Sequence, residues 1–182
     1  AYAAVLPAHL GYVITEKDKK SMIDGKEFVY TIAEKTEGDK KIKAYAFETG
    51  KSGYSGIIRS IVAVDENMKL LGISIIQQSE TPGLGDRSKE IQSSSTFFSH
   101  FFGNALNAEQ VKNRSWFEEQ FSGLDCTKPI GILKKGEYVS ASDELKKELA
   151  DKKSVSAITG ATITTKAVID SIAVGIERLQ KA

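Results

Sequence analysis

Residues that build cross-links and metal clusters are scarce in this sequence. Its 182 residues include one cysteine, two histidines and three prolines. The lone Cys126 excludes an internal disulfide and any iron–sulfur or zinc site made from several cysteines. His9 and His100 are the only imidazoles that could activate its thiol, so we interpret Cys126 as structural. His100 lies in the apolar run Phe97–Phe102, which favours a core or interface role, and no metal site is expected.

A large charge of one sign and a long apolar run are also absent. The formal net charge is +1, although 27% of the residues are charged. A nucleic-acid-binding domain usually carries a basic stripe, so no nucleic-acid partner is expected. The run Lys17–Lys20 includes an acid and is typical of a solvated face. No stretch of about 18 apolar residues occurs, so no part of this sequence is expected to cross a bilayer.

The rest of the composition and the apolar pattern predict a single globular domain over residues 1–182. Hydrophobic residues make up 41% of the chain. Period-2 alternation predicts one hairpin from Phe28–Ile32 and Ile42–Phe47, and a second from Ile57–Val64 and Leu70–Ile76. Because hairpins are followed by helical patterns, the predicted fold class is α+β, with antiparallel strands packed against helices.

Helices are predicted in three segments, Ser115–Phe121, Ser142–Asp151 and Thr165–Leu179. The last is amphipathic, and Thr164 or Thr165 is expected to be its N-cap. Its buried face is expected to hold Ile169, Ile172, Ala173, Ile176 and Leu179, and its solvent face Lys166, Asp170, Glu177 and Lys181.

A hydroxyl-rich turn, Thr159-Gly160-Ala161-Thr162-Ile163-Thr164-Thr165, stands between a predicted strand, Ser154–Thr159, and the last helix. The first turn of a helix presents unpaired N–H groups and the positive end of the helix dipole. An anion held at Thr162 would therefore lie in a favourable field. The alternative interpretation is a strand that turns into a capped helix and binds nothing.

A second loop, Glu80-Thr81-Pro82-Gly83-Leu84-Gly85, follows the strand Leu70–Ile76. Pro82 fixes one backbone torsion, and Gly83 and Gly85 tolerate positive φ, so the backbone can turn tightly and lie flat against a ring. An ordinary strand-ending turn is the alternative. A Gly53-Tyr54-Ser55-Gly56 turn precedes the hairpin that leads into this loop.

Together these loops resemble the FMN-binding domain of the G subunit of Rnf electron-transport complexes and of the C subunit of the sodium-pumping Nqr complex. Members of that family carry FMN joined through its phosphate to the last threonine of a hydroxyl-Gly-Ala-Thr loop, which is Thr162 here. The resemblance implies that Thr159, Gly160, Ala161, Ile163, Thr164 and Thr165 surround the attachment point. It also implies that Glu80, Thr81, Pro82, Gly83, Leu84, Gly85 and Tyr54 form the flavin pocket.

Within that pocket the resemblance leaves two roles open for each of two residues. Glu80 would either bond a backbone group or face the flavin ring. Tyr54 would either stack on the ring or fill the core, and we favour the core. No catalytic residue is assigned, because the resemblance implies an electron carrier rather than a stand-alone enzyme.

The resemblance also implies partners and a location. FMN would be attached by a separate flavin transferase of the ApbE type, because no activating base accompanies Thr162. The domain would work beside the other membrane subunits of an Rnf-type complex, on the extracytoplasmic face of the cytoplasmic membrane. Residues 1–25 would be a juxtamembrane segment, with a membrane-spanning helix before Ala1.

Two positions depart from the family pattern. Ser156 stands where an aspartate is usual, three residues before the first hydroxyl residue. If the transferase uses that carboxylate to help hold its metal, slower attachment or different recognition is expected. Gln78 stands where a histidine is frequent, so no imidazole role is transferred. The alternatives are an Nqr-type C subunit, a noncovalent FMN domain of an extracytoplasmic reductase, and a flavin-free binding module.

Overall fold

A five-stranded antiparallel sheet forms the centre of the fold, with its strands in chain order. The computed structural model describes residues 2, 5–6, 10–82, 85–89, 115–133, 142–144, 147, 151 and 154–182. Both predicted hairpins are confirmed, and the strands extend beyond the predicted bounds. The strands are β1 (Val13–Ile23), β2 (Lys26–Glu37), β3 (Lys40–Ser52), β4 (Ile57–Asp65) and β5 (Leu70–Gln77).

Strand β1 was not predicted from the sequence, because its residues carry almost no alternating signal. It is an edge strand that pairs only with β2, and nine of its first ten residues are exposed. Its register with β2 shifts on both sides of Glu16, and Asp18 has a φ of 52°. Lys17–Lys20 is exposed, as predicted for a solvated face. Charged residues on such an edge discourage pairing with other chains.

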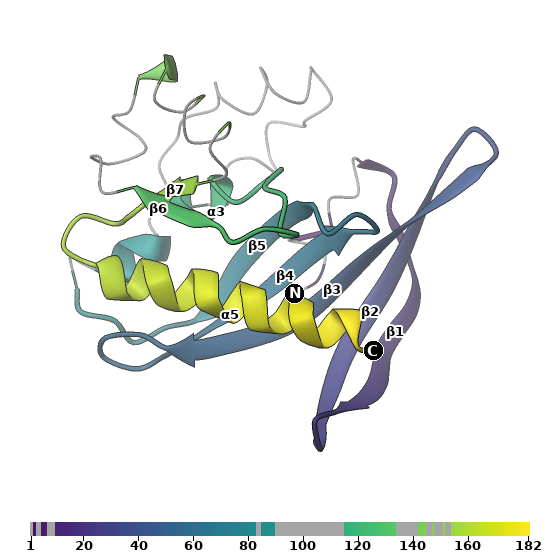
Figure 1. Ribbon diagram of the computed structural model, residues 1–182, viewed down its shortest axis with the longest axis horizontal. Coiled ribbons are helices and arrows are strands. Elements are labelled where there is room, and N and C mark those ends of the chain that lie inside the picture. Colours follow the sequence, from purple (N-terminus) through teal and green to yellow (C-terminus); the bar gives the residue numbers. More distant parts are fainter. Residues whose placement is uncertain are drawn as a thin grey trace.

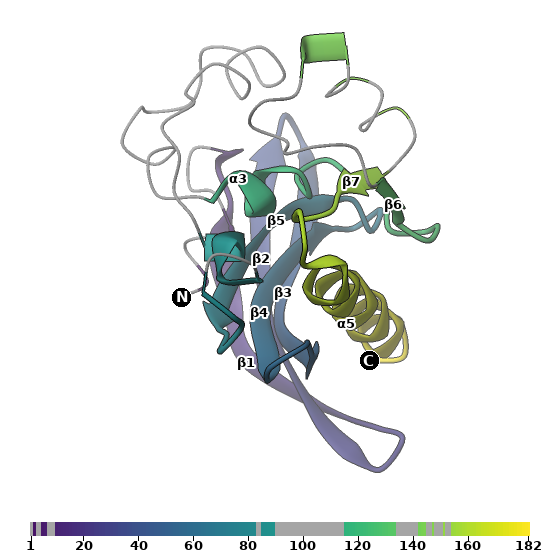
Figure 2. The ribbon, with the colours of Figure 1, turned by 90° about the vertical axis from the view of Figure 1, so that its left-hand side faces the viewer.

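Helix α5 (Thr162–Gln180) lies across one face of the sheet (Figures 1 and 2). Alternate residues of β2, β3 and β4, among them Phe28, Phe47 and Val62, point toward it and form the larger core. The α+β fold class is therefore confirmed. Within the described part of the chain, no helix is long and apolar enough to cross a membrane.

The predicted faces of α5 are largely confirmed, but its start is not where the sequence pattern placed it. The helix begins at Thr162 with Ala161 as N-cap, so Thr164 and Thr165 lie inside it. Their hydroxyls are used in tertiary hydrogen bonds instead of capping. Ala173, predicted to be buried, is exposed, whereas Ile169, Ile172, Ile176 and Leu179 are buried.

The opposite face of the sheet is covered by the N-terminal segment. Val5 and Leu6 are buried there, with exposed fractions of 0% and 4%. They form a second core cluster with small side chains from β2, β3 and β4, which allow the segment to approach closely: Ala33, Ala44, Ala46 and Ala63. The centre of the sheet, in β2 to β4, is therefore buried on both faces. The juxtamembrane role of residues 1–25 stays a prediction.

A smaller layer lies at one end of the sheet (Figure 2) and packs against the larger core. It contains the 3-10 helix η3 (Gly85–Lys89), the short helix α3 (Trp116–Glu119), and a parallel pair of strands, β6 (Gly131–Leu133) and β7 (Ser154–Ser156). Helix α3 is shorter than predicted, and β7 ends three residues before the predicted strand does. Half of the predicted helix 142–151 lies outside the described residues, and the described residues Asp143, Glu144, Lys147 and Asp151 are helical. His9 and the run around His100 also lie outside the described residues.

Cys126 has the environment of a structural thiol. It is half-buried, and its Sγ lies 3.9 Å from the Leu124 carbonyl oxygen. Burial, together with the nearby charge of Asp125, raises the pKa of the Cys126 thiol to about 12. The thiolate is the nucleophilic form, so this position does not favour thiol chemistry.

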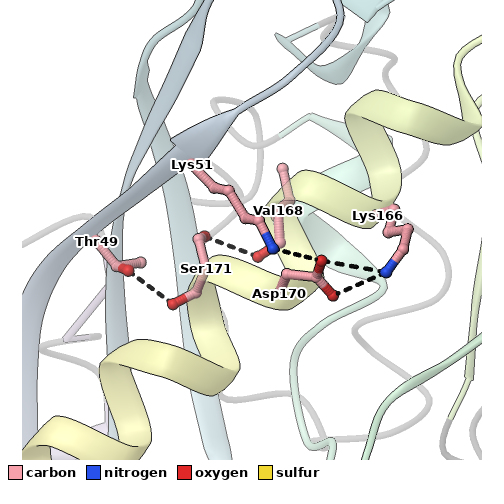
Figure 3. Close-up of polar contacts among 6 residues, drawn as sticks. All are labelled: Thr49, Lys51, Lys166, Val168, Asp170 and Ser171. Carbon is pink, nitrogen blue, oxygen red and sulfur yellow. Dashed lines mark hydrogen bonds and ion pairs between the residues drawn. The ribbon is translucent and has the colours of Figure 1, made fainter.

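Polar contacts tie α5 to β3 (Figure 3). Thr49 Oγ1 donates to the Ser171 carbonyl oxygen at 2.7 Å, and Lys51 Nζ lies 2.7 Å from Asp170 Oδ2. The Lys51 hydrogen bond lowers the pKa of the Asp170 carboxyl, and Lys166, 3.2 Å away, adds to this effect. These ion pairs are partly exposed, so they fix the helix orientation more than they stabilise the fold.

Gly175 allows α5 to approach β3 closely. A Cβ at Gly175 would lie only 2.3 Å from Phe47 Cε2 and 3.0 Å from Phe47 Cδ2. We expect Gly175→Ala to lower the free energy of unfolding by about 1–3 kcal/mol through overpacking, despite the higher helix propensity of alanine. Urea denaturation measures this change.

The matched control is Val174→Ala, on the exposed side of the same helix, which should change stability by less than about 0.5 kcal/mol. In a protein that already carries Phe47→Leu, Gly175→Ala should lower the free energy of unfolding by less than it does in the wild type. Equal losses from Gly175→Ala with and without Phe47→Leu would contradict a clash between these two residues.

Candidate functional site

The three loops that the sequence singled out meet at one buried carboxylate, that of Glu80. Its Oε1 accepts the Ser55 backbone N–H at 3.0 Å, and its Oε2 accepts the Tyr54 N–H at 3.2 Å. The Thr164 hydroxyl also donates to Oε2. Glu80 is only 6% exposed. Of the two roles left open for Glu80, the structure shows the hydrogen bonds to backbone groups.

Two glycines give the carboxylate its space. A Cβ on Gly53 would lie 2.6 Å from Glu80 Oε1, and a Cβ on Gly85 would lie 2.6 Å from Glu80 Cβ and 2.7 Å from Thr164 Oγ1. Neither glycine has a positive φ. The expectation that Gly85 serves by its backbone torsion is therefore wrong, because what the site needs at Gly85 is the absence of a side chain.

The hydrogen bonds to Glu80 keep it ionised. Burial raises the pKa of its carboxyl, but the hydrogen bonds from Thr164 Oγ1 and from the backbone of Ser55, Tyr54 and Gly56 outweigh burial. The net pKa lies below its ordinary value. An ionised carboxylate only accepts hydrogen bonds, which suits the hydroxyl and N–H donors that surround it.

The hydroxyls of the threonine-rich turn differ sharply in accessibility. Thr164 and Thr165 are 1% and 0% exposed. Thr165 Oγ1 accepts the Ile158 N–H at 3.1 Å and donates to the Ala161 carbonyl oxygen at 3.3 Å. Thr159 is exposed and Thr162 is half-buried. Among the four threonines of this turn, Thr159 and Thr162 are therefore the ones that an incoming group can reach.

The start of α5 suits an anion. Its N-cap, Ala161, makes no side-chain capping bond, and its first turn contains no acidic residue. The N–H groups of this turn are therefore not capped by a side chain, and the dipole favours a negative group near Thr162. Gly160, with a φ of 76°, provides the left-handed residue that turns the chain from β7 into the helix. These features fit a phosphate group.

The structure places the other predicted site residues around this point. Thr81 is half-buried, and its Oγ1 lies 3.2 Å from Ser55 Oγ. Pro82 and Ile163 are exposed, whereas Ala161 is buried. Gly83 and Leu84 lie outside the described residues.

Tyr54 corrects one prediction. Its side chain is 73% exposed, so it does not fill the core. The backbone of the Gly53–Gly56 turn is held by Glu80, and this fixes the turn while the ring points to solvent. The exposed ring is free to contact a ligand.

The two positions that depart from the family pattern have structural roles. Gln78 Oε1 accepts the Glu80 N–H at 2.6 Å and so supports the loop. Ser156 is fully buried, and its N–H donates to Gln120 Oε1 at 2.7 Å.

Sequence reasoning gave Ser55 no role, although its N–H binds Glu80. Among the described residues, no cluster of histidine, cysteine and carboxylate side chains could hold a metal ion.

Comparison with known proteins identifies the family. The model of the FMN-binding domain family matches residues 53–177, which include all three loops. The chain belongs to the FMN-binding domain family. Its similarity to the G subunit of the ion-translocating oxidoreductase complex of Haemophilus influenzae (strain PittEE) is 39% identity over 93 residues, covering 49% of this chain and 45% of that protein.

Two further relatives extend the similarity along this FMN-binding domain. The G subunit of the proton-translocating ferredoxin:NAD(+) oxidoreductase complex of Clostridium ljungdahlii is 28% identical over 167 residues, covering 92% of this chain and 68% of that protein. The crystal structure of Shewanella oneidensis NqrC has a TM-score of 0.52 at 15% identity, covering 94% of this chain and 70% of that chain, so it has the same fold. The match covers less than half the length of the first relatives.

Protonation of Glu80 is expected to weaken the FMN-binding domain. Because the folded-state pKa of Glu80 is lowered, its charge stabilises the fold above the ordinary value of 4.5, and this contribution is lost as the pH falls through the folded-state pKa. The difference in free energy of unfolding between the wild type and Glu80→Gln should therefore shrink as the pH falls from about 6 to about 3.5. Chemical denaturation at each pH measures it. A difference that stays constant over this range would contradict a lowered pKa.

A side chain at Gly85 should disrupt the site. Gly85→Ala would place a methyl group against Glu80 and Thr164, and we expect a loss of about 1–3 kcal/mol in the free energy of unfolding. Amide hydrogen exchange should show faster exchange at Tyr54 and Ser55. Gly175→Ala is the matched control, since it lowers stability at a distance from Glu80. In this variant the Tyr54 and Ser55 amides should exchange faster only as far as the lower global stability requires. Equal effects of both variants on these amides would argue against a local clash.

Proposed function

We propose that this domain carries FMN covalently on Thr162 and relays electrons in a membrane-bound Rnf-type complex. The family supports FMN as the cofactor. The accessibility of the four threonine hydroxyls supports the attachment point, because those of Thr164 and Thr165 are buried and hydrogen-bonded. Thr162 begins α5, where backbone N–H groups favour a phosphate, whereas Thr159 lies before the helix.

Bound FMN would supply the redox chemistry, and the protein residues would bind and orient it. The first turn of α5 would hold the phosphate, and the exposed side chains of Tyr54 and Ile163 would contact the ring system. Glu80 would support these elements from below the surface, through the Tyr54 N–H and the Thr164 hydroxyl.

Attachment requires a separate flavin transferase, which we propose to be of the ApbE type. The turn from Thr159 to Thr165 contains no histidine, carboxylate or lysine that could deprotonate the Thr162 hydroxyl. In the proposed step, Thr162 Oγ displaces AMP from the FMN phosphate of FAD, and the hydroxyl proton passes to a base of the transferase. The resulting phosphodiester keeps one negative charge at the helix terminus.

The relatives support the cellular context. Several are named as the G subunit of ion-translocating oxidoreductase complexes, and one of these names specifies ferredoxin:NAD(+) oxidoreductase. We therefore propose that the other subunits of such a complex are the partners, and that the domain works on the outer face of the cytoplasmic membrane.

Mass spectrometry of denatured protein tests the attachment. After export and coexpression with a flavin transferase, the peptide that contains Thr162 should gain the mass of FMN less one water. Thr162→Ala should abolish the adduct and leave stability nearly unchanged, since the half-buried hydroxyl contributes little to packing.

Thr159→Ala is the matched control and should keep the adduct in full. An adduct that survives in Thr162→Ala but disappears in Thr159→Ala would move the attachment to Thr159. Flavin that is released on denaturation would favour the noncovalent reductase domain, and a colourless protein would favour a binding module.

A further inference from the structure

Glu80 joins three chain segments that are far apart in the sequence. It lies in the loop after β5, its backbone donors lie in the Gly53–Gly56 turn, and its hydroxyl donor, Thr164, lies 84 residues further along the chain in α5. One oxygen atom, Oε2, accepts both the Tyr54 N–H and the Thr164 hydroxyl. The turn that carries Tyr54 and the first turn of α5 are therefore fixed to the same atom.

Two side chains beside these hydrogen bonds are exposed to solvent. The Tyr54 side chain is 73% exposed, and Ile163, which precedes Thr164, is 54% exposed. Both side chains are therefore accessible to a ligand at the surface above this buried network. Their relative position depends on Glu80, because the Tyr54 backbone N–H and the side-chain hydroxyl of Thr164, the residue after Ile163, both donate to it.

The carboxylate itself is held firmly. Gln78 Oε1 accepts the Glu80 N–H at 2.6 Å, and the Ser55 and Thr81 hydroxyls lie 3.2 Å apart. Gly53 and Gly85 pack so closely that a Cβ on either would overlap Glu80. Several hydrogen bonds and close packing by two glycines restrict where this buried carboxylate can lie, which makes it an effective support for its donors.

We propose that Glu80 is the positioning residue of the flavin site: it fixes the turn bearing Tyr54 relative to the first turn of α5, and so sets how Tyr54 and Ile163 contact the flavin carried on Thr162. This inference rests on the proposed function. Glu80 acts through Tyr54 and Thr164, and it is not required for formation of the phosphodiester bond.

Four variants separate this role from general stability. Glu80→Gln removes the charge and one acceptor oxygen, and Thr164→Val removes the hydroxyl donor at nearly constant shape. Thr164→Ser keeps the hydroxyl and should behave as the wild type. Asp170→Asn is the matched control, because it removes another hydrogen-bonded carboxylate, one that contacts Lys51 and Lys166 but not Glu80.

The first measurement uses the protein without flavin. Amide hydrogen exchange of Tyr54 and Ser55 should be about tenfold faster or more in Glu80→Gln, and the Tyr54 amide should exchange faster in Thr164→Val. Both amides should be unchanged in Thr164→Ser and in Asp170→Asn. Unchanged exchange in both Glu80→Gln and Thr164→Val would overturn the proposed link.

The second measurement uses the flavin-loaded protein. Iodide quenching of flavin fluorescence should increase about twofold, and fluorescence anisotropy should fall, in Glu80→Gln and Thr164→Val, with wild-type values in Thr164→Ser and Asp170→Asn. Mass spectrometry should find the Thr162 adduct in all of them. If Glu80→Gln does not fold, the comparison of Thr164→Val with Thr164→Ser decides the question.

The outcomes separate this inference from the proposed function. Faster amide exchange with unchanged quenching and anisotropy would mean that Glu80 only stabilises the fold, and would overturn the positioning role while leaving the proposed function intact. Absence of the adduct from the wild-type protein would overturn the proposed function, and the positioning role with it.

Discussion

The hydrogen bonds to the Glu80 carboxylate constrain the geometry of the whole site. A buried carboxylate without partners would be costly, so its donors are required by its burial. The donors come from the Gly53–Gly56 turn and from α5, which means that both must be in place before Glu80 is satisfied. Loop, turn and helix are thus coupled parts of one unit, and each is well placed only when the others are.

The position of the α5 N-terminus depends on packing along the rest of the helix. Gly175 brings the helix against Phe47 of β3, and Thr49 binds the Ser171 carbonyl oxygen (Figure 3). These contacts set the rotation of α5 about its axis and its distance from the sheet. They therefore also set the position from which Thr164 donates to Glu80. The centre of the sheet, in β2 to β4, is in turn buried on both faces, by α5 and by the segment with Val5 and Leu6. The rigid scaffold explains how a surface turn can be held in a defined geometry.

The features of the fold and site that could be predicted from the sequence are those whose signal lies in neighbouring residues. The alternation in β2 to β5 and the apolar stripe of α5 are local, so the α+β fold followed from the sequence. Strand β1 lacks alternation because it is an exposed edge. The N-cap prediction was wrong because the Thr164 hydroxyl binds Glu80 and the Thr165 hydroxyl binds the Ile158 N–H. The residues next to these threonines give no signal for such partners. The steric role of Gly85 and the exposure of Tyr54 are likewise set by contacts across the chain.

The electrostatics of the site explain why a covalent bond would be useful. The Gly53–Gly56 turn, the segment 78–82 and the turn Thr159–Thr165 contain one charged residue, Glu80, and it is negative. Lys166 follows directly but pairs with Asp170. A phosphate at Thr162 would thus be met chiefly by backbone N–H groups, and the dipole of a helix terminus contributes only about 0.3–1 kcal/mol at an exposed position. Micromolar retention of a free ligand requires about 8 kcal/mol. For a free ligand, exposed apolar contacts with Tyr54 and Ile163 would have to supply most of the remaining binding free energy. A phosphodiester bond would retain the flavin without that binding free energy, and these contacts would then only set the orientation of the ring.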